Sequence, residues 1–194
     1  MTYEIVAVGA SWGGLRALER LLSELPDDFG PAIVIAQHRG PDSTPDGLSG
    51  LLSVYARRTV RDAGDKEPIE SNGIYLAPPD YHLLVEPGAF ALSVDERVQN
   101  ARPSVDVLFE SVADAYRERA VGIVLTGANR DGARGLARIK ELGGVAIVQD
   151  PDDAVAQTMP TAALRAAAAD AVLPLAEIPR FLVGLCLEVG DRVV

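Results

Sequence analysis

Three polar residues of this chain could act together in nucleophilic catalysis. Ser11, His38 and Asp131 each follow shortly after an apolar run that is typical of a buried strand. A serine hydroxyl attacks a carbonyl poorly unless an imidazole takes its proton and a carboxylate fixes the tautomer of that imidazole. In an open parallel sheet the carboxyl ends of the strands lie at one edge. We therefore predict a Ser-His-Asp triad at that edge.

The turn that contains Ser11 allows more than one interpretation. Gly9-Ala10-Ser11-Trp12-Gly13 fits the G-x-S-x-G nucleophile elbow, in which glycines permit a sharp strand-to-helix turn. A Gly-rich phosphate loop is an alternative, although the turn departs from G-x-G-x-x-G and holds no basic residue. A helix-capping serine is another. The order Ser, His, Asp also differs from the Ser, acid, His order of ordinary α/β hydrolases.

Taken alone, His38 and Asp131 fit structural roles as well. A histidine after an apolar strand is often a hydrogen-bonded structural residue, and an aspartate before Gly132 is by default a helix N-cap. The catalytic interpretation therefore depends on the three residues together.

Apolar runs alternate with stretches of helical periodicity, which predicts an α/β fold. We expect a three-layer, doubly wound, mainly parallel sheet of about seven strands. The expected strands include residues 5–8, 32–36, 121–125 and 145–148, and the expected helices are 15–25, 48–55, 104–118, 132–141, 160–168 and 178–188. Short apolar runs separated by Pro78-Pro79-Asp80 and Pro87-Gly88 predict a β-hairpin excursion around residues 73–95.

Composition excludes several classes of protein. The 194 residues, with a net charge of -10 and 48% hydrophobic content, predict a single domain over residues 1–194. The acidic balance argues against nucleic acid as a partner. Neither a secretory signal nor a long apolar run is present, so we expect a cytoplasmic protein without membrane insertion. One cysteine, Cys186, and two histidines make a disulfide or a structural zinc site improbable.

Five segments of the chain carry a resemblance to a known family. They are Val8-Gly9-Ala10-Ser11-Trp12-Gly13-Gly14, Ile35-Ala36-Gln37-His38, Gly73-Ile74-Tyr75-Leu76-Ala77-Pro78 with His82, Arg102-Pro103-Ser104-Val105-Asp106-Val107-Leu108-Phe109, and Leu125-Thr126-Gly127 through Asp131-Gly132-Ala133. In this order and spacing the chain resembles the catalytic domain of chemotaxis protein-glutamate methylesterases, the CheB family, over about residues 4–187.

The resemblance implies a serine hydrolase that removes methyl esters from glutamate side chains on methyl-accepting chemotaxis receptors. Some family members also deamidate receptor glutamines. It assigns Ser11 as nucleophile, His38 as base and Asp131 as acid, with the oxyanion held in part by the backbone N–H of Ala128. We add the backbone N–H of Trp12 as a second candidate donor. No metal or organic cofactor is implied. The expected partner is the cytoplasmic domain of the receptor. His82 falls on a predicted hairpin strand, so we expect it to be structural or at the rim of the site, outside the triad.

This chain departs from the family pattern at several positions near the predicted site. Trp12 stands where the family usually has Thr or Ser, Ala128-Asn129 replaces Met-Gly, and Arg39-Gly40 replaces Met-Pro. The usual N-terminal receiver domain is absent from the sequence, so a separate receiver protein or the chemotaxis kinase is a candidate regulator. Two alternatives stay open: a non-catalytic receptor-binding or scaffold module, and a serine hydrolase of another ester.

Overall fold

The computed structural model describes residues 3–40, 44 and 47–187. Its centre is a seven-stranded parallel sheet in the order β3-β4-β2-β1-β7-β8-β9. The strands are β1 (Ile5–Ala10), β2 (Ala32–Gln37), β3 (Val60–Asp62), β4 (Ile74–Leu76), β7 (Ala120–Val124), β8 (Val145–Gln149) and β9 (Ala171–Leu173). The predicted doubly wound fold with about seven strands is confirmed.

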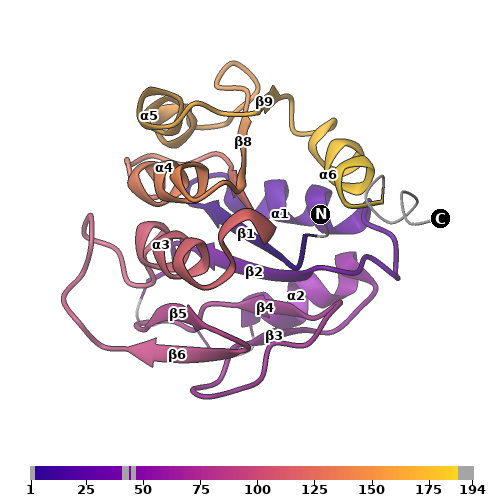
Figure 1. The fold of residues 1–194 in the computed structure, drawn as a ribbon, viewed down its shortest axis with the longest axis vertical. Coiled ribbons are helices and arrows are strands. Elements are labelled where there is room, and N and C mark those ends of the chain that lie inside the picture. The colour runs from indigo at the N-terminus through magenta and orange to yellow at the C-terminus, as the bar shows by residue number, and fades with distance from the viewer. Residues whose placement is uncertain (1–2, 41–43, 45–46, 188–194) are drawn as a thin grey trace.

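Helices cover both faces of the sheet, which gives the three layers seen in Figure 1. One face is covered by α1 (Gly14–Ser23), α2 (Gly47–Ala56) and α6 (Ile178–Leu187). The other is covered by α3 (Val105–Tyr116), α4 (Ala133–Glu141) and α5 (Thr158–Ala166), together with the antiparallel hairpin of β5 (His82–Glu86) and β6 (Ala89–Ser93). A short 3-10 helix, η1 (Arg117–Arg119), follows α3.

The apolar runs of β1 and β2 are continuous because both faces of these strands are covered. All residues of both strands are buried. Along β1, Ile5 and Ala7 pack toward the layer of α3, whereas Val6 and Val8 pack toward α1. The sequence pattern therefore identifies these strands correctly, since neither face needs polar residues.

One part of the predicted excursion was wrong. Residues 74–76 form β4, which pairs in parallel with both β2 and β3 and so belongs to the central sheet. Only β5 and β6 form the separate hairpin. The strands β3 and β9, with three residues each, were not predicted. A run of three residues is too short for periodicity to reveal.

Gly9 explains how α3 reaches the end of β1. A Cβ at this position would lie 2.2 Å from Cγ1 of Val105, the first residue of α3. The glycine therefore permits the N-terminus of α3 to lie directly against the strand that precedes Ser11. Among the described residues, no helix is both long enough and apolar enough to cross a membrane.

Candidate active site

Ser11 and His38 lie side by side because they follow paired residues of neighbouring strands. Ala10 of β1 pairs with Gln37 of β2, and the N–H of His38 donates to the carbonyl of Ala10 at 3.0 Å. Adjacent strands in a sheet are about 4.8 Å apart. The register of the sheet thus brings together two residues that are 27 positions apart in sequence.

The turn after β1 is fixed by hydrogen bonds to its backbone. Ser11 donates its N–H to the carbonyl of Thr126 at 3.0 Å, and the hydroxyl of Thr126 donates to the carbonyl of Trp12 at 2.9 Å. Gly13 has φ of +81°, a conformation that favours glycine, and α1 begins at the next residue. The turn therefore has the strand-to-helix geometry expected of a nucleophile elbow.

Asp131 lies fully buried against the N-terminus of α3. Its Oδ1 accepts from the hydroxyl of Ser104 at 2.8 Å and from the N–H of Asp106 at 2.9 Å, and its Oδ2 accepts from the N–H of Val105 at 2.7 Å. The prediction that an aspartate here could cap the helix that follows it in sequence is not met, since Gly132 is the N-cap of α4. The carboxylate instead uses the N-terminus of the preceding helix.

The pKa of Asp131 is lowered despite its burial. Desolvation by itself would raise the pKa, but the hydrogen bonds from His38 and from the N–H groups of Asp106 and Val105 outweigh it. The partial positive charge at the N-terminus of α3 acts in the same direction. Asp131 is therefore ionised at neutral pH and can orient an imidazole.

The base and the acid are in contact, and the other nitrogen of the base lies near Asn129. Nε2 of His38 lies 2.7 Å from Oδ2 of Asp131. Because a carboxylate only accepts, Nε2 carries the proton and Nδ1 holds the lone pair of the neutral ring. Nδ2 of Asn129 approaches Nδ1 at 3.4 Å. Within the described residues, the hydroxyl of Ser11 makes no hydrogen bond, a looseness common in unliganded active sites.

Two backbone N–H groups beside Ser11 are available to a ligand. In the described part of the chain, the N–H groups of Trp12 and Ala128 donate to no protein group, whereas those of Ser11 and Gly127 donate to Thr126 and Ala156. A Cβ at Gly127 would lie 2.9 Å from Cβ of Ser11, so this backbone passes very close to the serine. Backbone N–H groups without a protein acceptor are the kind of donor that an oxyanion hole uses.

Trp12 neither fills the site nor enters the core. Its side chain is 69% exposed, and Val155, which packs on Gly13, is 68% exposed. An indole this exposed does not fill a buried pocket, so the structure does not show the filled pocket that would have favoured a non-catalytic module.

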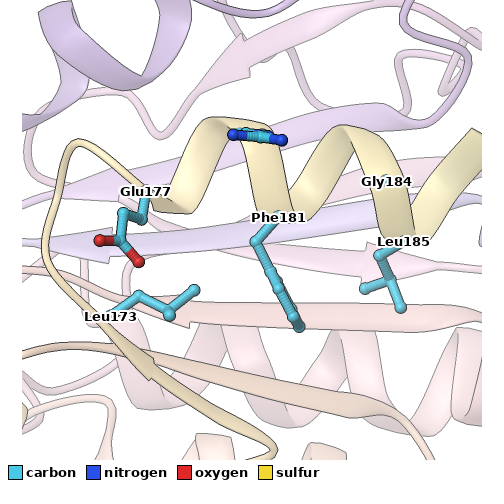
Figure 2. A pocket seen from close by; sticks show the side chains of 6 residues that line it. Leu173, Glu177, Phe181, Gly184 and Leu185 are labelled. Atoms are coloured by element: carbon cyan, nitrogen blue, oxygen red, sulfur yellow. The ribbon is translucent and has the colours of Figure 1, made fainter.

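A cavity of about 520 Å³ adjoins the base and is lined in part by His38, Arg39 and Asn129. Another cavity, of about 620 Å³, lies between α6 and β9 and contains no predicted site residue. Figure 2 shows Phe181 and Leu185 extending from α6 on the side where Leu173 lies. Chemistry is thus expected at the first cavity.

Sequence reasoning missed two residues that hold the site together. Nε2 of Gln37 donates to the carbonyls of Ser11 and His38, at 3.0 and 2.9 Å, and so joins the ends of β1 and β2. Ser104 was predicted only as a helix N-cap, but it also donates to Asp131. A polar residue at the end of an apolar strand was the available signal for Gln37. No local signal pairs Ser104 with a residue 27 positions away.

His82 is held by hydrogen bonds inside the protein. The side chain is buried, Nε2 contacts the carbonyl of Glu96 at 3.0 Å, and Nδ1 accepts from the N–H of Ser104 at 3.2 Å. The described residues contain no group of three or more His, Cys, Asp or Glu arranged to hold a metal ion.

The fold and the site together define an α/β protein with a serine, a histidine and an aspartate at the carboxyl edge of a parallel sheet. The CheB methylesterase family matches residues 6–182. The chain belongs to this family.

Similar proteins carry names that agree with this assignment. A protein of Leptospira interrogans, named a putative protein-glutamate methylesterase/protein-glutamine glutaminase, is 44% identical and is aligned over 95% of this chain and 96% of its own length. A protein-glutamate methylesterase/protein-glutamine glutaminase 2 of Anaeromyxobacter dehalogenans is 42% identical over 92% of this chain, which spans 52% of that protein.

A solved structure shows the same fold. The crystal structure of the Thermotoga maritima CheB methylesterase catalytic domain has a TM-score of 0.89 and 33% sequence identity, and the match covers 95% of this chain and 100% of that one.

Proposed function

We propose that this protein hydrolyses glutamate methyl esters on the cytoplasmic domain of methyl-accepting chemotaxis receptors, with Ser11 as nucleophile, His38 as base and Asp131 as acid. The observation that carries the proposal is the contact between Nε2 of His38 and the buried carboxylate of Asp131, beside the turn that presents Ser11. The names of the related proteins supply the substrate class.

In the first half of the reaction, Nδ1 of His38 takes the proton of the Ser11 hydroxyl as its oxygen attacks the ester carbonyl. The tetrahedral oxyanion accepts hydrogen bonds from the N–H groups of Trp12 and Ala128. The carbon–oxygen bond to the methoxy group then breaks, and His38 gives its proton to the leaving methanol. Asp131 stabilises the imidazolium that exists between these two proton transfers.

In the second half, water replaces methanol. His38 takes a proton from the water, whose oxygen attacks the glutamyl ester of Ser11, and then returns that proton to the serine oxygen. The products are a glutamate carboxylate, the free serine and one released proton. A receptor glutamine follows the same course with ammonia as the leaving group, so deamidation is a second activity of the same residues.

The test is methanol release from a methylated receptor cytoplasmic fragment by this chain and by its Ser11→Ala variant. We expect release by the parent and a loss of at least about 10³-fold in the variant. Circular dichroism and urea unfolding should show an intact fold in both. Near-normal release by Ser11→Ala would contradict the assignment of the nucleophile.

The alternatives predict different results in the same assay. A scaffold module binds the receptor fragment but releases no methanol. A hydrolase of another ester turns over small esters while the receptor esters persist. The contact between His38 and Asp131 favours the catalytic proposal over the scaffold, and the exposed Trp12 does not fill a buried pocket.

We further propose that residues 1–194 act as one catalytic domain in the cytoplasm, without a metal or an organic cofactor. We also propose a separate receiver protein or the chemotaxis kinase as a partner that controls its activity. Addition of a phosphorylated receiver protein to the methanol-release assay tests this regulation directly.

A further inference from the structure

The cavity beside His38 has a basic lining. Arg39, Arg97 and Arg102 contribute to it, and none of the lining residues that the structure describes is an aspartate or a glutamate. His38 and Asn129 line the same cavity, so it is continuous with the candidate active site. Three guanidinium groups in one cavity are unexpected in a chain with a net charge of -10.

These arginines differ in how fully their donors are used. Arg102 donates to Asp80 and to the carbonyls of Val94 and Asp95, and it therefore anchors the loop that leads to α3. Arg97 has one carboxylate nearby, with its Nη2 at 3.6 Å from Oδ1 of Asp80, and half of its side chain is exposed. Arg97 is thus free to take a second acceptor.

Arg39 is the most unusual of the three. Only 7% of its side chain is exposed, and Nη2 donates to Oδ1 of Asp62 and to the carbonyl of Ala77, each at 2.6 Å. Its Nε and Nη1 are buried and have no partner among the residues that the structure describes. Buried donors are nearly always hydrogen-bonded, so two open donors on one buried guanidinium at a cavity wall indicate that an acceptor is missing.

We propose that this cavity is a carboxylate subsite, in which Arg39 and Arg97 bind an acidic side chain of the same substrate segment that carries the ester. The inference rests on the proposed function and specifies its substrate: the ester lies at Ser11, and a free carboxylate lies on the far side of His38. A guanidinium matches a carboxylate because its paired N–H donors meet both oxygens. The segment recognised is therefore an acidic peptide.

Charge complementarity supports this occupant over a neutral one. An acidic segment is repelled by the overall charge of the chain, so its binding requires a local basic region of this kind. Asp80 already neutralises part of Arg102, and Asp62 part of Arg39, but Arg97 remains mostly unpaired.

The first experiment measures binding and does not depend on turnover. The probes are two receptor fragments with the same glutamate methyl ester, one with its neighbouring glutamates intact and one with these replaced by glutamines. Isothermal titration gives the Kd of each fragment for Ser11→Ala, Ser11→Ala/Arg97→Gln and Ser11→Ala/Arg180→Gln. Arg180 is the matched control, because it is an exposed arginine of α6 beside the other cavity.

We expect Ser11→Ala and the Arg180→Gln control to bind the acidic fragment about tenfold more tightly than the amidated one, as expected for one charged hydrogen-bonded pair. Arg97→Gln should reduce this preference to less than about threefold by weakening binding of the acidic fragment alone. An unchanged preference in Arg97→Gln, or equal binding of both fragments by Ser11→Ala, would overturn the subsite.

Arg39→Met provides a second variant, with the residue usual in the family at this position. It removes one partner of Asp62 and can reduce stability, so urea unfolding accompanies it. If it folds, it should lose the same preference as Arg97→Gln. Failure of the proposed function has another signature: the parent releases no methanol from either fragment, while the binding data still decide whether the subsite exists.

Discussion

Asp131 and Ser11 lie at the same edge of one sheet, but they are held in opposite ways. Asp131 is fully buried and accepts four hydrogen bonds, from His38, Ser104, Val105 and Asp106. Ser11 is partly exposed, and only its backbone is fixed. Its hydroxyl makes no hydrogen bond within the described residues.

The difference follows from what each group must do. A buried carboxylate is stable only when donors saturate its oxygens, and saturation also fixes the imidazole that contacts it. A nucleophile must change partners during a reaction, and a hydroxyl tightly bound in the resting state would resist that change. The acid and base therefore form a rigid half of the site, and the serine turn forms an open half.

Within the rigid half, we expect a substitution of Asp131 to reduce turnover and stability the most. In Asp131→Asn, the amide NH₂ faces groups that are themselves donors, and the amide oxygen is a weaker acceptor than a carboxylate. The variant should therefore be less stable and should orient His38 less well. We expect turnover of Asp131→Asn to fall about 10³–10⁴-fold. Urea unfolding should show a loss of about 2–4 kcal/mol.

The matched control is Ser104→Ala, which removes one of the four donors and leaves the carboxylate in place. It should cost about 1 kcal/mol and less than tenfold in turnover. If Ser104→Ala and Asp131→Asn had equal effects on turnover, the charge of Asp131 would not be what orients the base.

Two neighbouring carboxylates of the rigid half should respond to pH in opposite directions. Hydrogen bonds lower the pKa of Asp131 against the effect of burial, whereas burial raises the pKa of Asp106 more than the N–H of Gly135 lowers it, and the charge of Asp131 raises it further. In the unfolded chain both have a pKa of about 3.9.

The sign of each contribution follows from proton linkage. Asp131 stabilises the folded state fully above about pH 4, and this stability is lost as pH falls through its lowered pKa. For Asp106, the folded state binds its proton more tightly, so stability falls as pH rises from about 4 through the raised pKa.

Free energies of unfolding at pH 3, 4, 5 and 7 for the parent, Asp131→Asn and Asp106→Asn should show these trends. The advantage of the parent over Asp131→Asn should shrink as pH falls below about 4. Relative to Asp106→Asn, the parent should instead gain as pH falls toward 4. The same trend in both variants would contradict the opposite environments of the two groups.

The sequence predicted the parts of the molecule that depend on local pattern. β1 and β2 were recognised because they are long apolar runs, and Ser11 and His38 were placed at their ends. The strand β4 was assigned to the hairpin because only its long-range pairing with β2 and β3 reveals the sheet to which it belongs. Three residues of sequence do not reveal which strands they pair with.

The triad was predicted, but its supports were not. Apart from His38, the donors of Asp131 come from the N-cap and first residues of α3, and the position of this helix end depends on the absence of a side chain at Gly9. The packing of the folded chain decides which ring nitrogen of His38 faces Asp131. It turns Nε2 toward the carboxylate and leaves Nδ1 to Asn129. Such contacts depend on distances between elements, which composition and periodicity do not contain.

A substitution of Asn129 tests the open half of the site, and it should have the smallest effect of those described. Its Nδ2 approaches Nδ1 of His38 at 3.4 Å, the nitrogen that must accept the proton of Ser11, so the amide competes with the nucleophile for one lone pair. Its Oδ1 also accepts from the N–H of Asp131 at 3.1 Å.

Asn129→Gly restores the glycine usual in the family and removes the competing donor. We expect the rate of inactivation by a sulfonyl fluoride, which reports the reactivity of Ser11, to rise about two- to fivefold, as expected for release of one weak hydrogen bond. Asn129→Asp is the control, because it retains the oxygen that accepts from Asp131 but has no donor. If Asn129→Gly instead lowered the rate, the amide would assist the base rather than compete with Ser11.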